Sequence, residues 1–271
     1  NASRFIMMNM EDKVISKPDE ADFEVTDKWI LSKVNTLAKD VTENMDKFEL
    51  GIAVQKVYDF IWDEFCDWYI EITKVRTYNK ENDPASANAA FWTLKTVLTE
   101  ALKLLHPFMP FITEEIFCNL QEEEDTIMLS NWPVYKEEWA FEAEHEATET
   151  IKEAVRAIRN VRTSMNVPPS KKATVYVVSE DDAVLKIFEN SRSFFASLGY
   201  AGEVILQKDK AGIGEDAVSA VIHKAVIYMP FAELVDIEKE VQRLKTEEKR
   251  LEGELKRSHA MLGNEKFVSK A

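Results

Sequence analysis

Five basic side chains near the middle of the chain could bind the phosphates of a nucleic acid. Arg156, Arg159 and Arg162 recur every three residues, so we expect them along one side of a helix, and Lys171 and Lys172 follow after two prolines. Each phosphate that such a patch neutralises adds about 0.9 to the salt slope of binding to duplex nucleic acid. The alternative is that these cations form ion pairs with the acidic segment that precedes them.

Trp29 is the aromatic side chain with the best position for contact with a base. It lies about 120° from the mean direction of the apolar stripe of its predicted helix, which places it off the main buried face. A large exposed aromatic can stack on an unpaired base, an interaction worth about 1–3 kcal/mol per base. Lys28 beside it could hold a phosphate or a base edge. The alternative is that Trp29 packs against another helix or domain.

No arrangement of residues in the sequence indicates catalysis. The four histidines are scattered, and the cluster from Ala211 to Gly214 lacks the Lys-Ser/Thr pair that completes a phosphate-binding loop. Cys66 and Cys118 are the two cysteines, and neither belongs to a CxxC motif. We therefore expect two reduced thiols, no metal site, no cofactor and no catalytic activity in this chain itself.

The charge of the chain is strongly negative and unevenly distributed. The net charge of −15 weakens any case for nonspecific binding to nucleic acid, and binding to DNA is not predicted. Twelve acidic residues and one basic residue lie between Glu114 and Glu149. A basic face elsewhere can still bind phosphates, because charges beyond about 8 Å are largely screened. No apolar run approaches the ~20 residues of a membrane span, so no membrane association and a cytoplasmic location are predicted.

Helices must position these residues over the first half of the chain, because Gly and Pro are scarce and apolar residues recur at helical spacing. The third predicted helix has the most regular pattern, with spacings of four and three that are typical of a helical-bundle seam. Its seam residues are Val54, Tyr58, Ile61, Phe65, Trp68, Ile72 and Val75. Glu71, Lys74 and Arg76 are expected to be exposed at its end. The predicted helices cover about 1–10, 19–45, 49–78, 85–105 and 110–120.

The second half is predicted to hold a small α/β unit and then a heptad helix. A helix over about 145–165 ends at two prolines, and helical segments are expected over 183–190 and 193–198. Strands are predicted over 173–179, 203–207 and 224–231. The heptad seam consists of Ile237, Val241, Leu244, Leu251, Leu255 and Leu262. The predicted domains are a helical bundle with an acidic linker over 1–143, an α/β subdomain over 144–233 and one coiled-coil arm over 234–271.

Several runs in this sequence resemble class I aminoacyl-tRNA synthetases, and their valyl branch most closely. They follow the order of that family and cover nearly the whole chain: NASRF, VTDKWILSKVN, WDEFCDWYIE, HPFMPFITEEIF, MNVPPSKK and DIEKEVQRL. The resemblance implies a mainly α fold, with an antiparallel helical bundle of the anticodon-binding type, a small α/β subdomain and a C-terminal coiled-coil helix. It also implies that the chain is the C-terminal part of a synthetase, and that the second arm of the coiled coil is absent.

The resemblance implies a function in tRNA binding. The bundle would bind the anticodon of tRNA(Val), with Asn1 and Arg4 bonded to base edges and Trp29 stacked on a base. The coiled coil would contact the outer corner of the tRNA through Arg243, Lys249 and Arg250. ATP and Mg would bind in an absent catalytic domain, because no HIGH-like or KMSKS-like motif occurs here, and the parent protein would be a monomer.

Four alternatives remain from the residues. Arg4 could pair with an acidic neighbour in the bundle. The mixed charges after residue 236 are also normal for an exposed coiled-coil face. The chain could instead resemble an isoleucyl enzyme, although many of those end in a Cys-rich zinc segment that is not found here. The last alternative is a helical scaffold that dimerises through the heptads and binds no RNA.

Overall fold

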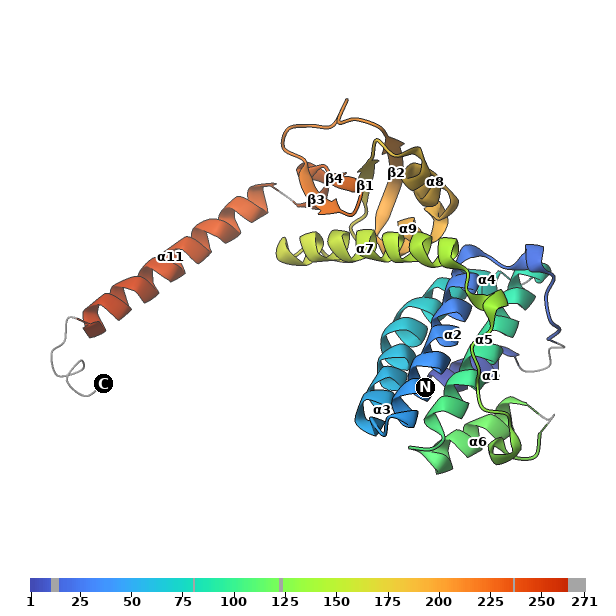
Figure 1. Ribbon diagram of the computed structural model, residues 1–271. Coiled ribbons are helices and arrows are strands. Elements are labelled where there is room, and N and C mark those ends of the chain that lie inside the picture. Colours follow the sequence, from blue (N-terminus) through green and yellow to red (C-terminus); the bar gives the residue numbers. More distant parts are fainter. Residues whose placement is uncertain (11–14, 80, 122–123, 236, 263–271) are drawn as a thin grey trace. The chain divides into compact units, whose positions relative to one another are not determined.

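The computed structural model describes residues 1–10, 15–79, 81–121, 124–235 and 237–262 (Figure 1). The structure is mainly helical, with one small four-stranded sheet, as the sequence predicted. It forms two compact units, Asn1–Thr150 and Ile151–Ala271. Within the described ranges, no helix combines the length and the apolar character that crossing a membrane requires. A coiled-coil arm as a separate domain stays a prediction.

Helices make up the first unit. Capping residues define several of their ends: Glu24 and Asp27 form a reciprocal capping box at the start of α2, and Asp83 accepts a hydrogen bond from the Ser86 amide at the start of α5. Pro84 and Pro110 occupy first-turn positions, where a missing amide proton costs nothing. The helices are α1 (Ala2–Met10), α2 (Val25–Asp46), α3 (Leu50–Asp59), a π-helix (Phe60–Ile70), α4 (Glu71–Tyr78), α5 (Pro84–Leu105) and α6 (Pro110–Leu120).

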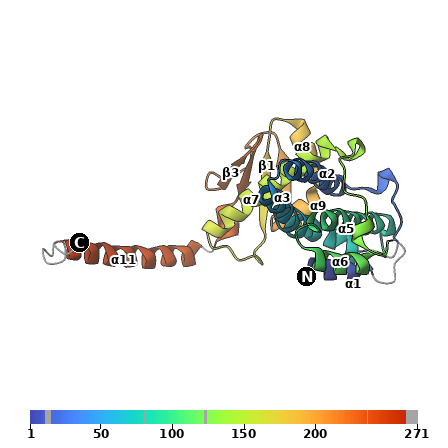
Figure 2. The same ribbon diagram turned by 60° about the horizontal axis from the view of Figure 1, so that its bottom comes forward.

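The core of this unit forms around α2, which packs against α3, the π-helix and α5. Figures 1 and 2 show α6 beside α5, and α1 contacts both of these helices. This unit also contains short 3₁₀ helices at Glu20–Asp22, Ile127–Leu129 and Glu137–Trp139. The last of them contacts α2. Because α2 has neighbours on several sides, apolar side chains are buried around most of its circumference.

The regular seam predicted for the third helix is wrong at both ends. Tyr58 and Val75 are 58% and 57% exposed, while Val57 and Phe60 are buried instead. The cause is the π-helix between α3 and α4, which adds residues to each turn and so rotates the buried face relative to an α-helix. The buried phenyl rings of Phe60 and Phe65 are accordingly five positions apart and stacked, with centroids 6.5 Å apart.

The second unit contains a mixed sheet in the order β2-β1-β4-β3. β1 and β2 are parallel, and the other two pairs are antiparallel. β3 was not predicted from the sequence, because it is an edge strand in which small and exposed residues replace a clear apolar pattern. The elements are α7 (Glu142–Ser164), which starts within the first unit, β1 (Ala173–Val178), α8 (Asp182–Asn190), α9 (Arg192–Leu198), β2 (Ala201–Gln207), β3 (Val218–Ile222), β4 (Ala225–Met229), α10 (Phe231–Leu234) and α11 (Ile237–Leu262).

Apolar side chains of the sheet and its helices form the core of this unit. Val175 and Val177 of β1 are buried, and the rings of Phe188 and Phe195 meet edge to face with centroids 5.0 Å apart. Ile158 of α7 is also buried. The sheet and the C-terminal half of α7 therefore position the basic residues that the sequence singled out.

Candidate nucleic-acid interface

Trp29 lies in the core of the first unit, so its predicted position off the buried face is wrong. Its side chain is 0% exposed, and its Nε1 donates a hydrogen bond to Oε1 of Glu149 at 3.0 Å. The apolar stripe suggested a single buried face on α2. The segment that leads into α7 covers a second face, where Ser32 and Asn35 also bond to the carbonyls of Ala140 and Lys136. Trp29 is therefore not available to stack on a base in this structure.

Two lysines of α2 form ion pairs with acidic residues in the first turns of α7. Lys28 Nζ lies 3.5 Å from Glu144 and 5.6 Å from the centroid of the Phe141 ring. Lys33 Nζ lies 2.9 Å from Glu149. These ion pairs hold the first turns of α7 against α2, so part of the acidic charge in this segment has a structural role. Lys28 is consequently engaged within the protein.

Arg162 is a structural residue, which corrects its assignment as a phosphate ligand. It is 3% exposed, and its Nη2 donates to the carbonyls of Pro168 at 2.9 Å and Lys171 at 2.5 Å. Its guanidinium carbon also lies 5.1 Å from the centroid of the Tyr200 ring. Burial lowers the pKa of Arg162. The side chain therefore closes the proline-containing loop that leads from α7 to β1.

The remaining members of the basic group do not share one exposed face. Arg159 donates from Nε to the carbonyl of Leu198 at 3.0 Å and is half-buried. Arg156 and Lys172 are exposed, and Lys171 is half-buried. The prediction that the three arginines lie along one exposed side of the helix is wrong, because Arg162 is buried whereas Arg156 is exposed. Arg156, Lys171 and Lys172 remain the accessible candidates for phosphate contact.

We expect Arg162→Ala to destabilise the second unit by about 1–3 kcal/mol, because it removes two charge-assisted hydrogen bonds from a buried guanidinium to carbonyls of the loop. Unfolding in urea, followed by circular dichroism, measures this change. Lys172→Ala, an exposed neighbour in the same loop region, serves as the control and should leave the midpoint almost unchanged. Equal midpoints for Arg162→Ala and the unmodified chain would contradict the structural role.

Asn1 and Arg4 are exposed at the start of the chain, and Arg4 lies on α1. Among the described residues, the Arg4 guanidinium has no hydrogen-bonding or ion-pairing partner, so the alternative of a pair within the bundle finds no support there. The neighbouring Phe5 ring lies 5.8 Å from Lys74 Nζ. Arg4 is therefore the accessible cation at the N-terminal end of the first unit that could bond to a base edge.

The basic residues of α11 lie on an exposed helix. Arg250 is held by Glu247 and Glu254, each at 2.6 Å, and these carboxylates raise its pKa. Lys249 is exposed. The side chain of Arg243 lies outside the described residues, as do those of Ile237, Leu244 and Leu262. In the seam, Val241, Leu251 and Leu255 are exposed, and their packing in a coiled coil stays a prediction.

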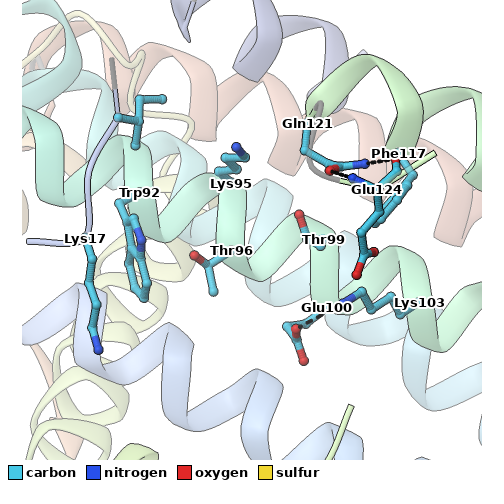
Figure 3. Close-up of a pocket in the computed structure, with 11 residues that line it drawn as sticks. Lys17, Trp92, Lys95, Thr96, Thr99, Glu100, Lys103, Phe117, Gln121 and Glu124 are labelled. Carbon is cyan, nitrogen blue, oxygen red and sulfur yellow. Dashed lines mark hydrogen bonds and ion pairs between the residues drawn. The ribbon is translucent and has the colours of Figure 1, made fainter. Parts of the chain in front are cut away.

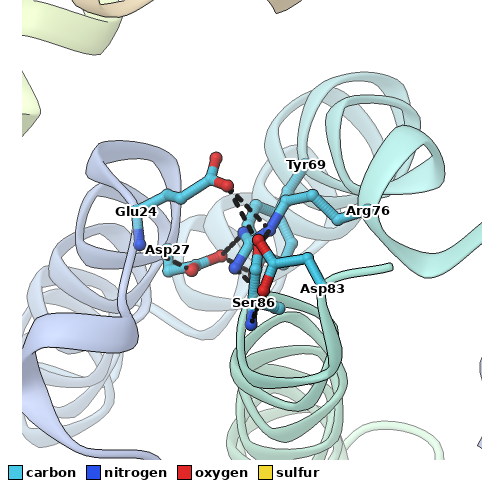
Figure 4. Close-up of polar contacts among 6 residues, drawn as sticks. All are labelled: Glu24, Asp27, Tyr69, Arg76, Asp83 and Ser86. Carbon is cyan, nitrogen blue, oxygen red and sulfur yellow. Dashed lines mark hydrogen bonds and ion pairs between the residues drawn. The ribbon is translucent and has the colours of Figure 1, made fainter. Parts of the chain in front are cut away.

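A polar cluster that was not predicted from the sequence lies at the N-terminal end of α2 (Figure 4). Oδ1 of Asp27 accepts hydrogen bonds from the Tyr69 hydroxyl at 2.6 Å and from Nη1 of Arg76 at 2.7 Å. Arg76 also donates to the carbonyl and the hydroxyl of Ser86 at 2.7 Å and lies 3.0 Å from Glu24. The expected exposure of Arg76 is wrong. Its position seven residues after Tyr69, on the same face two turns later, was the available signal.

Burial and charge in this Asp27 cluster shift the pKa values of Arg76 and Tyr69. Burial, the largest single effect on the pKa of Arg76, lowers it, but the charge and hydrogen bond of Asp27, with the electrostatic effects of Tyr69 and Glu24, together raise this pKa above its usual value. Burial, reinforced by the Asp27 charge, raises the pKa of Tyr69 well above its usual value, so the phenol stays a hydrogen-bond donor. The cluster joins α2, the π-helix, α4 and α5, and so fixes the frame of the first unit.

Most helices of the first unit, and α7 after them, lie within a segment that matches a known family of tRNA ligase domains. Residues 27–177 match the family described as the anticodon-binding domain of tRNA ligases, and the chain belongs to this family. The valine–tRNA ligases of Clostridium acetobutylicum, Clostridium tetani and Clostridium perfringens are 45%, 48% and 45% identical to it over 272 aligned positions, which cover 100% of the chain. The predicted resemblance to the valyl branch is confirmed. The chain spans about 30% of the length of these relatives.

Proposed function

We propose that this chain is the tRNA-binding region of a valine–tRNA ligase and that it recognises the anticodon of tRNA(Val). The observation that carries the proposal is the alignment of the whole chain with valine–tRNA ligases at 45–48% identity, together with the anticodon-binding match. Binding energy from contacts far from the reacting atoms can position the acceptor end of the tRNA for catalysis. This region would contribute such contacts and no chemical step.

Three accessible surfaces would contact the tRNA. Arg4, with Asn1 beside it, would bond to base edges of the anticodon loop, since a guanidinium offers two parallel donors to a guanine edge. Arg156, Lys171 and Lys172 would contact phosphates. The helix α11, with Lys249 and Arg250, would form one arm of a coiled coil at the outer corner of the tRNA, and Arg250 would have to exchange its two glutamate partners for a phosphate.

The reaction itself would belong to a longer parent protein in the cytoplasm. The parent would attach valine to its tRNA with ATP and Mg, and it would act as a monomer. Among the described residues, no group of three or more His, Cys, Asp or Glu could hold a metal ion. This region would bind and orient the tRNA.

We expect the chain to bind tRNA(Val) more tightly than the same tRNA with a replaced anticodon, and more tightly than tRNA(Ile). Arg4→Ala should cost about 1–3 kcal/mol of binding to tRNA(Val), the usual worth of a good base-edge contact. Fluorescence anisotropy at two salt concentrations measures these affinities. Low salt strengthens phosphate contacts, so the anticodon preference should be clearest at the higher concentration.

Lys186→Ala is the control, because it removes an exposed lysine of α8 that is outside all three proposed surfaces. It should leave the preference for the valine anticodon intact. Equal affinity for all three RNAs would reject anticodon recognition and leave only phosphate binding. An unchanged preference in Arg4→Ala would reject the role of Arg4 alone.

A further inference from the structure

A cavity of about 340 Å³ lies on one side of α5, between the chain segment 15–17 and the end of α6 (Figure 3). Trp92, Thr96 and Thr99 follow one another along the α5 wall, with Lys95 on the same helix. Lys17 lies beside Trp92 at one end. We call this cavity the α5 pocket. Its volume falls within the usual range of about 300–1,000 Å³ for small-molecule sites.

The charges of the α5 pocket favour an anion. Lys17 and Lys95 have no ion-pairing partner among the residues that the structure describes. Of the two acidic side chains of the wall, Glu100 lies 4.0 Å from Lys103, and Glu124 accepts a hydrogen bond from the Ser130 hydroxyl. The described wall thus carries three lysines against two carboxylates. Two lysines therefore remain available to a ligand, in a recess where less water screens their charge than on an open surface.

The walls also offer neutral groups that suit a nucleoside. The hydroxyls of Thr96 and Thr99 have no hydrogen-bonding partner in the described part of the chain, so they can bond to sugar hydroxyls or base edges. The indole of Trp92 is half-buried, and the ring of Phe23 fixes it edge to face at 5.6 Å between centroids. A fixed aromatic ring loses little entropy when a base stacks on it.

The segment that carries Lys17 is held in place before any ligand binds. The Ser16 amide donates to Oδ1 of Asn88 at 3.3 Å, and Nδ2 of Asn88 donates back to the Ser16 carbonyl at 3.0 Å. These two bonds tie the segment to α5 one turn before Trp92. The buried ring of Phe117 lines the pocket from α6. The site is therefore assembled from three separate parts of the chain.

We propose that the α5 pocket binds a nucleoside monophosphate, with the lysines attracting the phosphate, the threonines bonding to the ribose and Trp92 in contact with the base. The nucleotide could be free or could be one residue of an RNA strand, because both have this chemistry. The pocket contains none of the residues proposed above for the anticodon or for the phosphates of tRNA. It can therefore be tested without tRNA.

The experiment titrates the whole chain with adenosine 5′-monophosphate, adenosine and inorganic phosphate, by calorimetry at low salt. The monophosphate should bind more tightly than either of its parts. Lys95→Ala and Thr99→Val should each weaken it by about fivefold, the worth of one hydrogen bond or of a charge-assisted contact. Lys47→Ala is the matched control, because it removes an exposed lysine of the same unit outside the pocket. Circular dichroism verifies that each variant is folded.

Competition with tRNA separates the two sources of the nucleotide. If tRNA displaces the monophosphate and Lys95→Ala weakens tRNA binding, the pocket takes a nucleotide of RNA. If both ligands bind independently, it takes a free nucleotide. No binding of the monophosphate, or the same loss in Lys47→Ala as in Lys95→Ala, would overturn the proposal. Neither result affects anticodon preference, so a failure here is distinct from a failure of the proposed function.

Discussion

Replacing Arg76 with methionine is expected to destabilise the first unit by about 3–5 kcal/mol, because the change leaves the buried Asp27 carboxylate without its cation. Asp27 is fully buried, and its Oδ1 lies 2.7 Å from Nη1 of Arg76. Methionine keeps most of the side-chain volume, so the loss reports the charge and the hydrogen bonds more than a cavity. Urea unfolding of the chain measures it, with the m-value as a test for an unchanged transition.

The double variant Asp27→Asn/Arg76→Met shows whether the cost comes from the unpaired charge. Removing both charges should recover a large part of the lost stability, because a buried ion pair gains little over a neutral replacement. Lys74→Met is the surface control: it breaks an exposed pair with Glu71 and should cost about 0–1 kcal/mol. If Arg76→Met cost no more than Lys74→Met, the Asp27 cluster would not be an anchor of the fold.

Helix positions were predictable from the sequence where local chemistry sets them. Pro84 and Pro110 mark the observed starts of α5 and α6, and the β-branched run at β1 marks the observed strand. The π-helix was not predictable in this way. Its inserted turn depends on how the rings of Phe60 and Phe65 pack in the assembled unit, whereas a spacing pattern assumes a constant 3.6 residues per turn.

The candidate site was less predictable, because the type of a residue does not determine what covers it. Arg4 remains accessible as expected, but Arg162 satisfies two carbonyls of its own loop, and Lys28 pairs with an acid 116 positions later in the chain. Arg76 was expected to be exposed, but its side chain is largely buried, because its partner Asp27 is also distant in the sequence. In each case the deciding partner is distant in sequence or is a backbone group, so the helical spacing of a residue does not by itself identify that partner.

Trp29→Ala is expected to destabilise the first unit by about 3–5 kcal/mol, the usual cost of removing a large buried aromatic. The indole is fully buried, and the substitution also removes its hydrogen bond to Glu149, which keeps its ion pair with Lys33. Trp29→Phe should cost less, because it keeps most of the ring and loses mainly the hydrogen bond. Thermal unfolding compares the two, with Trp62→Ala, which removes a 57% exposed indole, as the control.

This result decides how a loss of tRNA binding in a Trp29 variant is to be interpreted. If Trp29 is only a core residue, Trp29→Phe should bind tRNA(Val) normally at a temperature where it is fully folded. Trp29→Ala should lose binding only in proportion to its unfolded fraction. A folded Trp29→Ala variant with weakened, anticodon-dependent binding would contradict this view. It would show that the indole leaves the core when tRNA binds, which requires breaking its bond to Glu149.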